Sequence, residues 1–285
     1  MIKKYTILTL LIFAKITSYA QVPDIDNDFL LDSLYIQEVE GKKAIDKVLH
    51  AEPLYIDLIR DLGARKGEKE WNFGFGLTDR NRGDMYTALV EYEWAPIDRL
   101  GLEIELPFSF YYPNQQSTEE RSSKLNSFKA AAQYSFYVSE KNSTSMAIGY
   151  IHEFELTEFN KYRKSNIYTG NIFNPFFIAA KRWGTNFHTL LYTGPSIFTH
   201  LNSTHTEFAW QVNSNIHYMI PGTRNFIGME VNKNFLNNDF DMVLRPQMRV
   251  GIADNLLIGI VTGIPVNRAN DRLSTFLRII YEPGH

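Results

Sequence analysis

Four histidines lie in one stretch of the sequence, with a spacing that could place two pairs of imidazoles side by side. The stretch TNFHTLLYTGPSIFTHLNSTHTEFAWQVNSNIHYMI holds His188, His200, His205 and His217. A two-residue hairpin turn at residues 202–203 would set His200 opposite His205 and His188 opposite His217. Directly opposed imidazoles are close enough to share a metal ion. Polar positions inside a barrel or at its rim also suit histidine, and we favour that interpretation over a metal site.

A second set of residues combines carboxylates with basic side chains. Glu103 and Glu105 are two apart, which would place them next to each other on one face of a strand. Paired carboxylates can do acid–base chemistry, but no nucleophile accompanies them. The whole set comprises Glu91, Glu93, Glu103, Glu105, Lys129, Glu153, Glu155, Glu230, Arg245, Arg249 and Arg278. We favour an internal ion-pair network that stiffens a barrel; the alternative is a polar pathway or ligand site.

The sequence carries no motif of an established enzyme class. It has no nucleophile elbow, HExxH motif or Gly-rich phosphate loop, so an enzyme is the less favoured interpretation and no cofactor is expected. The absence of Cys excludes disulfides, thiolate metal sites and Cys nucleophiles. With 29 basic and 32 acidic residues the chain has a net charge of −3, so nucleic acid is not an expected partner.

The segments that would position these residues alternate between apolar and polar side chains. In LGLEIELPFSFYYP, residues 102–112 alternate strictly, a length that matches a tilted membrane strand of ~9–11 residues better than a soluble strand of ~5–6. The pattern recurs and predicts about twelve strands, an even number as in bacterial barrels. We therefore expect an all-β fold, a single transmembrane antiparallel up-and-down β-barrel. The alternative is a soluble sandwich or a lipocalin-like barrel.

The connections between the predicted strands differ in length in a regular way. The short turns APID, SEKNST, WGT, PGTR and ADN alternate with connections that include the long, charged PNQQSTEERSSK and TEFNKYRKSNIYTGN. Outer-membrane barrels have short periplasmic turns and longer external loops. We therefore expect the barrel over residues 71–285, with both of its ends on the periplasmic side.

The first twenty residues resemble a secretory signal peptide. Lys3 and Lys4 precede the apolar run YTILTLLIFA, and the small-residue end SYA predicts cleavage after Ala20. Export and a barrel together predict the outer membrane of a Gram-negative bacterium, with outer-membrane lipid as a partner. Residues 21–70 are then expected to form a periplasmic segment.

Ahead of the first strand, HAEPLYIDLIRDLG has the pattern of a short amphipathic helix. Pro53 suits a first helical turn, Leu54, Leu58 and Leu62 fall on one face, and Gly63 suits the position after the end. The pattern predicts a helix over about residues 53–62. A helix this short must pack on the barrel, as a cap on the periplasmic rim or as a plug in the lumen, and we favour the rim. It could also serve a periplasmic partner.

The same stretch contains a family signature. Its residues are His50, Ala51, Glu52, Pro53, Leu54, Tyr55, Ile56 and Asp57. The octet is identical to the signature of the HAEPLYID family of Bacteroidota proteins, and the chain resembles that family in its export signal, length and strand content. The resemblance implies an outer-membrane barrel, similar in style to the barrels named after meta-pathway phenol degradation, and carries over no catalytic residues.

We expect the protein to be a narrow, porin-like channel or transporter for a small-molecule solute or apolar ligand. The alternatives are a barrel-embedded envelope enzyme acting on lipid-like substrates and a structural or scaffold barrel.

Overall fold

The computed structural model describes residues 25–41, 44–56, 58–81, 83–113, 122–163, 166–201, 206–236, 239–268 and 271–283. The signal peptide predicted over residues 1–20 lies outside these residues. Within the described ranges, no helix has the length and apolarity needed to cross a membrane.

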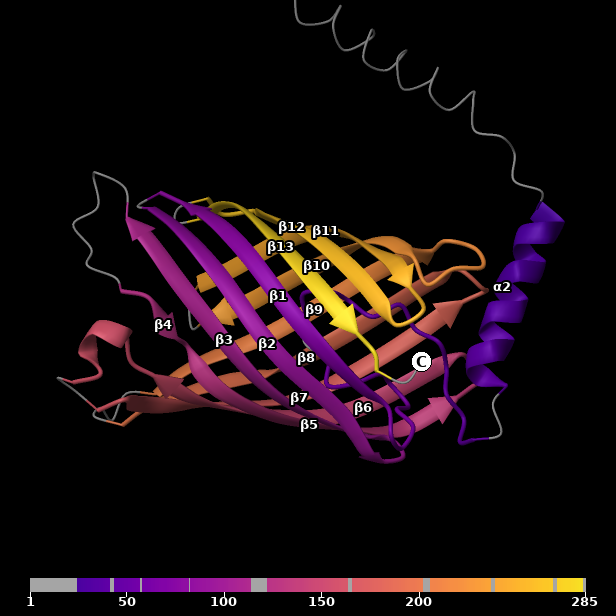
Figure 1. The fold of residues 1–285 in the computed structure, drawn as a ribbon, viewed down its shortest axis with the longest axis horizontal. Helices are drawn as coiled ribbons and strands as arrows, with labels where there is room; N and C mark the ends of the chain where they lie inside the picture. Colours follow the sequence, from indigo (N-terminus) through magenta and orange to yellow (C-terminus); the bar gives the residue numbers. More distant parts are fainter. Residues whose placement is uncertain are drawn as a thin grey trace, which may run out of the picture.

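The described strands form one closed antiparallel sheet (Figure 1). Their bounds are β1 (Lys69–Arg80), β2 (Gly83–Ile97), β3 (Leu100–Pro113), β4 (Lys124–Leu125), β5 (Ser127–Ser139), β6 (Thr144–Leu156), β7 (Tyr168–Trp183), β8 (Phe187–His200), β9 (Thr206–Met219), β10 (Phe226–Leu236), β11 (Asp239–Ala253), β12 (Leu256–Pro265) and β13 (Asp271–Tyr281). The two-residue β4 pairs only with β3, so the ring itself has the twelve strands that the sequence predicted. Pairing of β1 with β13, with Trp71 opposite Tyr281, closes it.

The two faces of the sheet differ in polarity as the alternation predicted. Along β3, Glu103 is 1% exposed whereas the next residue, Ile104, is 41% exposed. Large apolar side chains such as Phe75, Ile148 and Trp210 are exposed on other strands. Because successive side chains of a strand point to opposite faces, the polar set lines the interior and the apolar set covers the outside.

The predicted register between β8 and β9 is confirmed. His188 lies opposite His217, Tyr192 opposite Asn213, and Pro195 opposite Trp210. The ladder runs to Thr199 and Thr206, while residues 202–205, which include His205, lie outside the described residues.

The two ends of the barrel differ in the lengths of the connections between strands. Short turns such as residues 98–99 and 254–255 lie at one end, which we call the turn end. The connection of residues 157–167, which includes η2 (Phe159–Lys161), lies at the other, the loop end. Helix α2 (Ile25–Glu40) lies outside the ring of strands at the turn end (Figure 1).

The chain thus has one described N-terminal helix, but not where the sequence placed it. The predicted helix at residues 53–62 is wrong, because the described residues between Glu40 and Lys69 form no helix or strand. Backbone N–H groups of Leu54 and Arg60 bond instead to the strand side chains of Gln247 and Glu93. Since the barrel wall supplies partners that a helix would supply internally, the segment can stay irregular and remain satisfied.

The predicted position at the rim is also wrong. Residues 44–56 and 58–68, which we call the plug, enter the lumen from the turn end (Figure 1). Leu54, Ile59 and Leu62 are buried there, and side chains of β2, β5, β6, β8 and β11 bond to plug residues. A helix with apolar residues on one side suits a segment that packs on a single surface. The barrel surrounds this segment, so its apolar residues can be buried in several directions.

Candidate functional site

The family signature is the part of the plug that docks on β6, β8 and β11. His50 Nε2 lies 2.9 Å from Ser145 Oγ. The Ala51 N–H donates to His188 Nδ1 at 2.8 Å, and the Leu54 N–H donates to Gln247 Oε1 at 2.9 Å. These hydrogen bonds are buried, so each lost partner would leave a polar group unsatisfied.

Apolar residues of the plug belong to two buried clusters that they form with residues of the inner wall. Ile56, Leu58, Ile59 and Leu62 share a buried cluster with strand residues that include Phe176. A second cluster holds Leu54 with Ala51, Phe226, Leu257 and Val261.

Two wall glycines make room for the plug. A Cβ atom at Gly259 would lie 2.5 Å from the side chain of Leu54. One at Gly101 would lie 2.1 Å from the carbonyl oxygen of Ile59. The missing side chains let the Leu54 side chain and the backbone of Ile59 lie directly against the strands.

Among the described residues of the signature, Tyr55 is the exposed one. The guanidinium carbon of Arg245 lies 3.3 Å from the centre of its ring, and Phe276 meets the ring edge-on at 6.1 Å. Arg245 also donates to Asn232 Oδ1 at 2.6 Å. Arg245 lies nearer the loop end of β11 than Gln247, the partner of Leu54, so Tyr55 presents its ring on the loop-end side of the plug.

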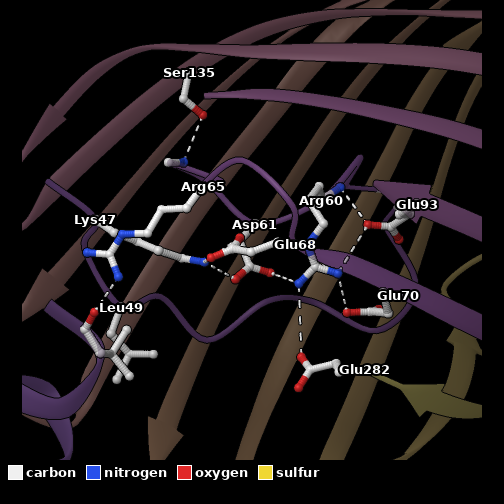
Figure 2. Close-up of polar contacts among 12 residues, drawn as sticks. Lys47, Leu49, Arg60, Asp61, Arg65, Glu68, Glu70, Glu93, Ser135 and Glu282 are labelled. Carbon is white, nitrogen blue, oxygen red and sulfur yellow. Dashed lines mark hydrogen bonds and ion pairs between the residues drawn. The ribbon is translucent and has the colours of Figure 1, made fainter. Parts of the chain in front are cut away.

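Arg60 joins the plug to the strands opposite the signature (Figure 2). Its guanidinium lies 2.5 Å from Glu70 Oε2 and 2.6 Å from Asp61 Oδ1. The backbone N–H of Arg60 donates to Glu93 Oε2 at 2.6 Å. The Gln133 amide donates to its carbonyl oxygen at 2.9 Å. Burial opposes the positive charge, but the surrounding carboxylates outweigh it and raise the pKa of Arg60.

Lys47 links two carboxylates of the plug, Asp61 and Glu68 (Figure 2). Lys47 Nζ lies 2.6 Å from Asp61 and 2.8 Å from Glu68. Burial favours the neutral form of both Glu52 and Asp61; Arg60 and Lys47 overcome it at Asp61 and lower that pKa, whereas the pKa of Glu52 is raised. Of the two carboxyl groups, Glu52 is therefore the one whose surroundings favour the protonated form.

The structure places every residue of the predicted charge set on the inner face. Most are buried, and Glu153 and Glu155 are partly buried. They do not form one network. Glu91 pairs with Arg278 at 3.4 Å, and Lys129 lies 3.1 Å from Glu103 and 2.7 Å from Glu105.

Of the other predicted charges, Glu153 lies directly opposite Lys129 of this group, and the rest have other partners. Glu155 pairs with Lys124 at 3.6 Å, and Glu230 accepts from Asn232 at 2.6 Å and from Gln247 at 3.2 Å. Arg249 lies over the ring of Phe226.

The predicted histidine pairs have different surroundings. His188 and His217 are buried and directly opposed. However, His188 accepts a hydrogen bond from the Ala51 N–H, and His217 lies 2.9 Å from the side chain of Gln247. His200 contacts Glu207 at 3.2 Å, and His205 lies outside the described residues. Across the part of the chain that is described, a set of three ligand atoms close enough for one metal ion occurs at Glu91, Glu93 and Glu103 and not at the histidines. A histidine metal site stays the less favoured interpretation.

Several site residues were missed by the sequence reasoning. Asn72, Glu70 and Gln133 occupy inward positions of β1 and β5, and the alternation of those strands could have identified them. Arg60 could not be found that way, because nothing in the local pattern shows that an irregular segment would carry it into the lumen.

A cavity of about 460 Å³ lies between the plug, α2 and the turns. Its lining includes Tyr35 of α2, Glu52 and Arg65 of the plug, and Arg224 and Arg249 of the barrel. Helix α2 holds its place there through Asp32, which accepts from the Gly222 N–H at 3.0 Å, and through Glu40, which pairs with Arg182 at 2.6 Å. The turn end therefore has a polar chamber that ends at the plug.

Comparisons with known proteins agree with this architecture. The barrel is similar to the COG4313 outer membrane channel from Pseudomonas putida F1, with a TM-score of 0.62, 12% identity, and coverage of 80% of this chain and 99% of that one. It is also similar to the KdgM porin, with a TM-score of 0.51, 13% identity, and coverage of 74% and 98%. Identities this low show a shared fold alone. No curated protein matches the sequence.

The family comparison covers both the plug and the barrel. The model of the family described as HAEPLYID-like matches residues 46–282. The match includes the signature octet, so the resemblance predicted from the sequence is confirmed. The chain belongs to the HAEPLYID-like family.

Proposed function

We propose that the protein is an outer-membrane channel or transporter for small molecules whose lumen is closed by the plug at rest. The observation that carries this proposal is the plug itself. Its described residues form no helix or strand, and side chains from all around the wall hold it in place through hydrogen bonds, ion pairs and apolar contacts. Such a segment can be displaced without breaking the barrel ladder.

The outer surface supports a membrane location. Exposed aromatic and aliphatic side chains such as Phe75, Ile148 and Trp210 would form large apolar patches on a water-soluble protein. Lipid-facing positions of transmembrane barrels have this composition, and the interior of such barrels is polar.

Planar-bilayer conductance tests the proposal. We expect the wild-type protein to show small or intermittent currents and the Leu58→Asp/Ile59→Asp double variant to show larger and longer openings. Leu58 and Ile59 are buried in the plug cluster, so two charges there oppose docking. The matched control is Leu30→Asp/Leu34→Asp, which adds the same charges at exposed positions of α2.

The outcomes separate the alternatives. Larger currents in the plug variant alone would support a plugged channel. Absence of current in all three proteins, with intact barrels, would contradict a channel and favour an enzyme or a scaffold.

A further inference from the structure

The inner face of β1, β2 and β3 holds more carboxylates than its cations can balance. Glu70, Glu91, Glu93, Glu103 and Glu105 project from these strands. In the described chain, the cations that come within ion-pair distance of this group are Arg60, Lys129 and Arg278. The wall therefore carries an excess of negative charge away from bulk water, which is costly unless it is neutralised.

The register of β2 and β3 adds to the cost of this negative charge, because it places carboxylates directly opposite each other. Glu93 lies directly opposite Glu103, and Glu91 directly opposite Glu105. Like charges opposed across a ladder are destabilising, since their side chains are only ~4.5–5.5 Å apart. Lys129 approaches Glu103 and Glu105 from β5. The carboxylates opposite them are near guanidinium groups instead, with Arg278 at 3.4 Å from Glu91 and Arg60 at 3.8 Å from Glu93.

Three of the carboxylates converge closely enough to share one ion. One oxygen from each of Glu91, Glu93 and Glu103 lies within 4.8 Å of the other two, and these residues are 0%, 3% and 1% exposed. Calcium–oxygen distances of about 2.3–2.6 Å allow two oxygens on the same ion to be at most ~5 Å apart. The spacing therefore fits a single cation.

Two buried side chains at this position have oxygen atoms without a hydrogen-bond donor among the described residues, which is an observation separate from the number of carboxylates. Neither oxygen of the buried Glu103 accepts a hydrogen bond from the described residues; its ion-pair partner is the Lys129 ammonium, 3.1 Å from Oε1. Asn72 is fully buried, and its Oδ1 likewise has no hydrogen-bond donor among them.

The amide of Asn72 points into the cluster. Its nitrogen lies 2.7 Å from Glu91, 3.0 Å from Glu93 and 2.8 Å from Glu70, which is three acceptors for two N–H hydrogens. Rotation of the amide by half a turn would bring its oxygen to the carboxylates. That orientation is favourable only if a cation lies between them.

We propose that Glu91, Glu93, Glu103 and Asn72 form a binding site for a hard divalent cation of the calcium class on the inner wall. All four ligands are oxygens, which suits calcium or magnesium rather than a metal that prefers nitrogen or sulfur. Glu93 also accepts the Arg60 N–H, so the ion would stiffen the part of the wall on which the plug rests. This proposal does not depend on the channel function.

Isothermal titration with CaCl₂ tests the site on the full-length protein, folded in detergent and stripped with EDTA. We expect one calcium ion per chain. Glu103→Gln keeps the side-chain shape but removes a charged ligand, so affinity should fall by about tenfold or more. Asn72→Asp adds a charged ligand and should raise affinity. The control Glu207→Gln, at an exposed carboxylate of β9, should bind as the wild type does.

Heat-modifiable migration on gels shows whether each variant is folded. Absence of calcium and magnesium binding at millimolar concentrations in folded wild-type protein and in Asn72→Asp would overturn the proposal and leave protons to neutralise the cluster. Binding that Glu103→Gln and Asn72→Asp leave unchanged would overturn it as well, because the ion would then lie elsewhere.

Discussion

The guanidinium of Arg60 lies among Asp61, Glu70, Glu93 and Glu282, while its backbone adopts a φ of +63°. A non-glycine residue in this left-handed region costs roughly 1–2 kcal/mol. The plug accepts this strain because the same turn presents both the side chain and the backbone N–H to the acidic wall.

Arg60 therefore gives a prediction that separates charge from strain. Arg60→Ala should weaken plug docking by about 3–5 kcal/mol, because it leaves buried carboxylates without their partner. Arg60→Gly should lose about 1 kcal/mol less, since glycine adopts the positive φ freely. Denaturant titration of a label on the plug measures both, with the exposed Lys66→Ala as control. Equal losses for Ala and Gly would contradict the strain argument.

His50 predicts how docking depends on pH. Burial, with His188 and Arg182 adding repulsion, lowers its pKa to about 3 from an ordinary value of 6.5. The released plug then takes up a proton below pH 6.5 whereas the docked plug does not, so the contribution to docking is complete above pH 6.5 and is lost as the pH falls towards 3.

We expect open-channel current to rise as the pH is lowered from 7.5 to 4.5. His50→Gln keeps a polar group near Ser145 but cannot titrate, so its current should change less over the same range. An identical pH dependence in wild type and variant would show that another group controls release.

Among the elements, the plug has no stability of its own and takes its shape from the strands around it. Gly101 on β3 tests this dependence, because a Cβ atom there would lie 2.1 Å from the carbonyl oxygen of Ile59. The backbone of the plug would have to move, while an alanine at this site fits the strand itself.

Gly101→Ala should therefore release the plug at Ile59 and Arg60 without opening the barrel. Limited trypsin digestion should cut after Arg60, Arg65 or Lys66 at a rate at least tenfold above wild type, which corresponds to about 1.4 kcal/mol. Gly251→Ala is the matched control, since a Cβ atom there meets its neighbours at 3.5 Å or more. Unchanged cleavage in Gly101→Ala would show that the plug tolerates displacement at this contact.

For the whole molecule, the closed ring and its apolar exterior predict behaviour that differs from that of a soluble barrel. We expect the protein in the outer-membrane fraction, extracted only by detergent, with heat-modifiable migration on gels. Recovery as a detergent-free periplasmic monomer would contradict the membrane assignment and return the sandwich-like alternatives.

Much of the barrel could be predicted from the sequence because its determinants are local. Alternation with a period of two assigns each residue to the lumen or the outside. The single turn between β8 and β9 sets the pairing of His188 with His217 over the whole hairpin. These features depend on neighbours in the chain or across one hairpin. They can therefore be predicted without knowledge of the rest of the fold.

The position of the plug and the ion pairs that join strands distant in sequence depended on the tertiary structure. The pattern of residues 53–62 predicts a helix on one packing surface, but inside the barrel Gln247, Glu93 and Ser135 supply the hydrogen bonds that a helix would otherwise make. Arg278 of β13 meets Glu91 of β2 only because β1 pairs with β13 and closes the ring. Contacts of this kind arise from closure of the sheet around the chain, and no local pattern encodes them.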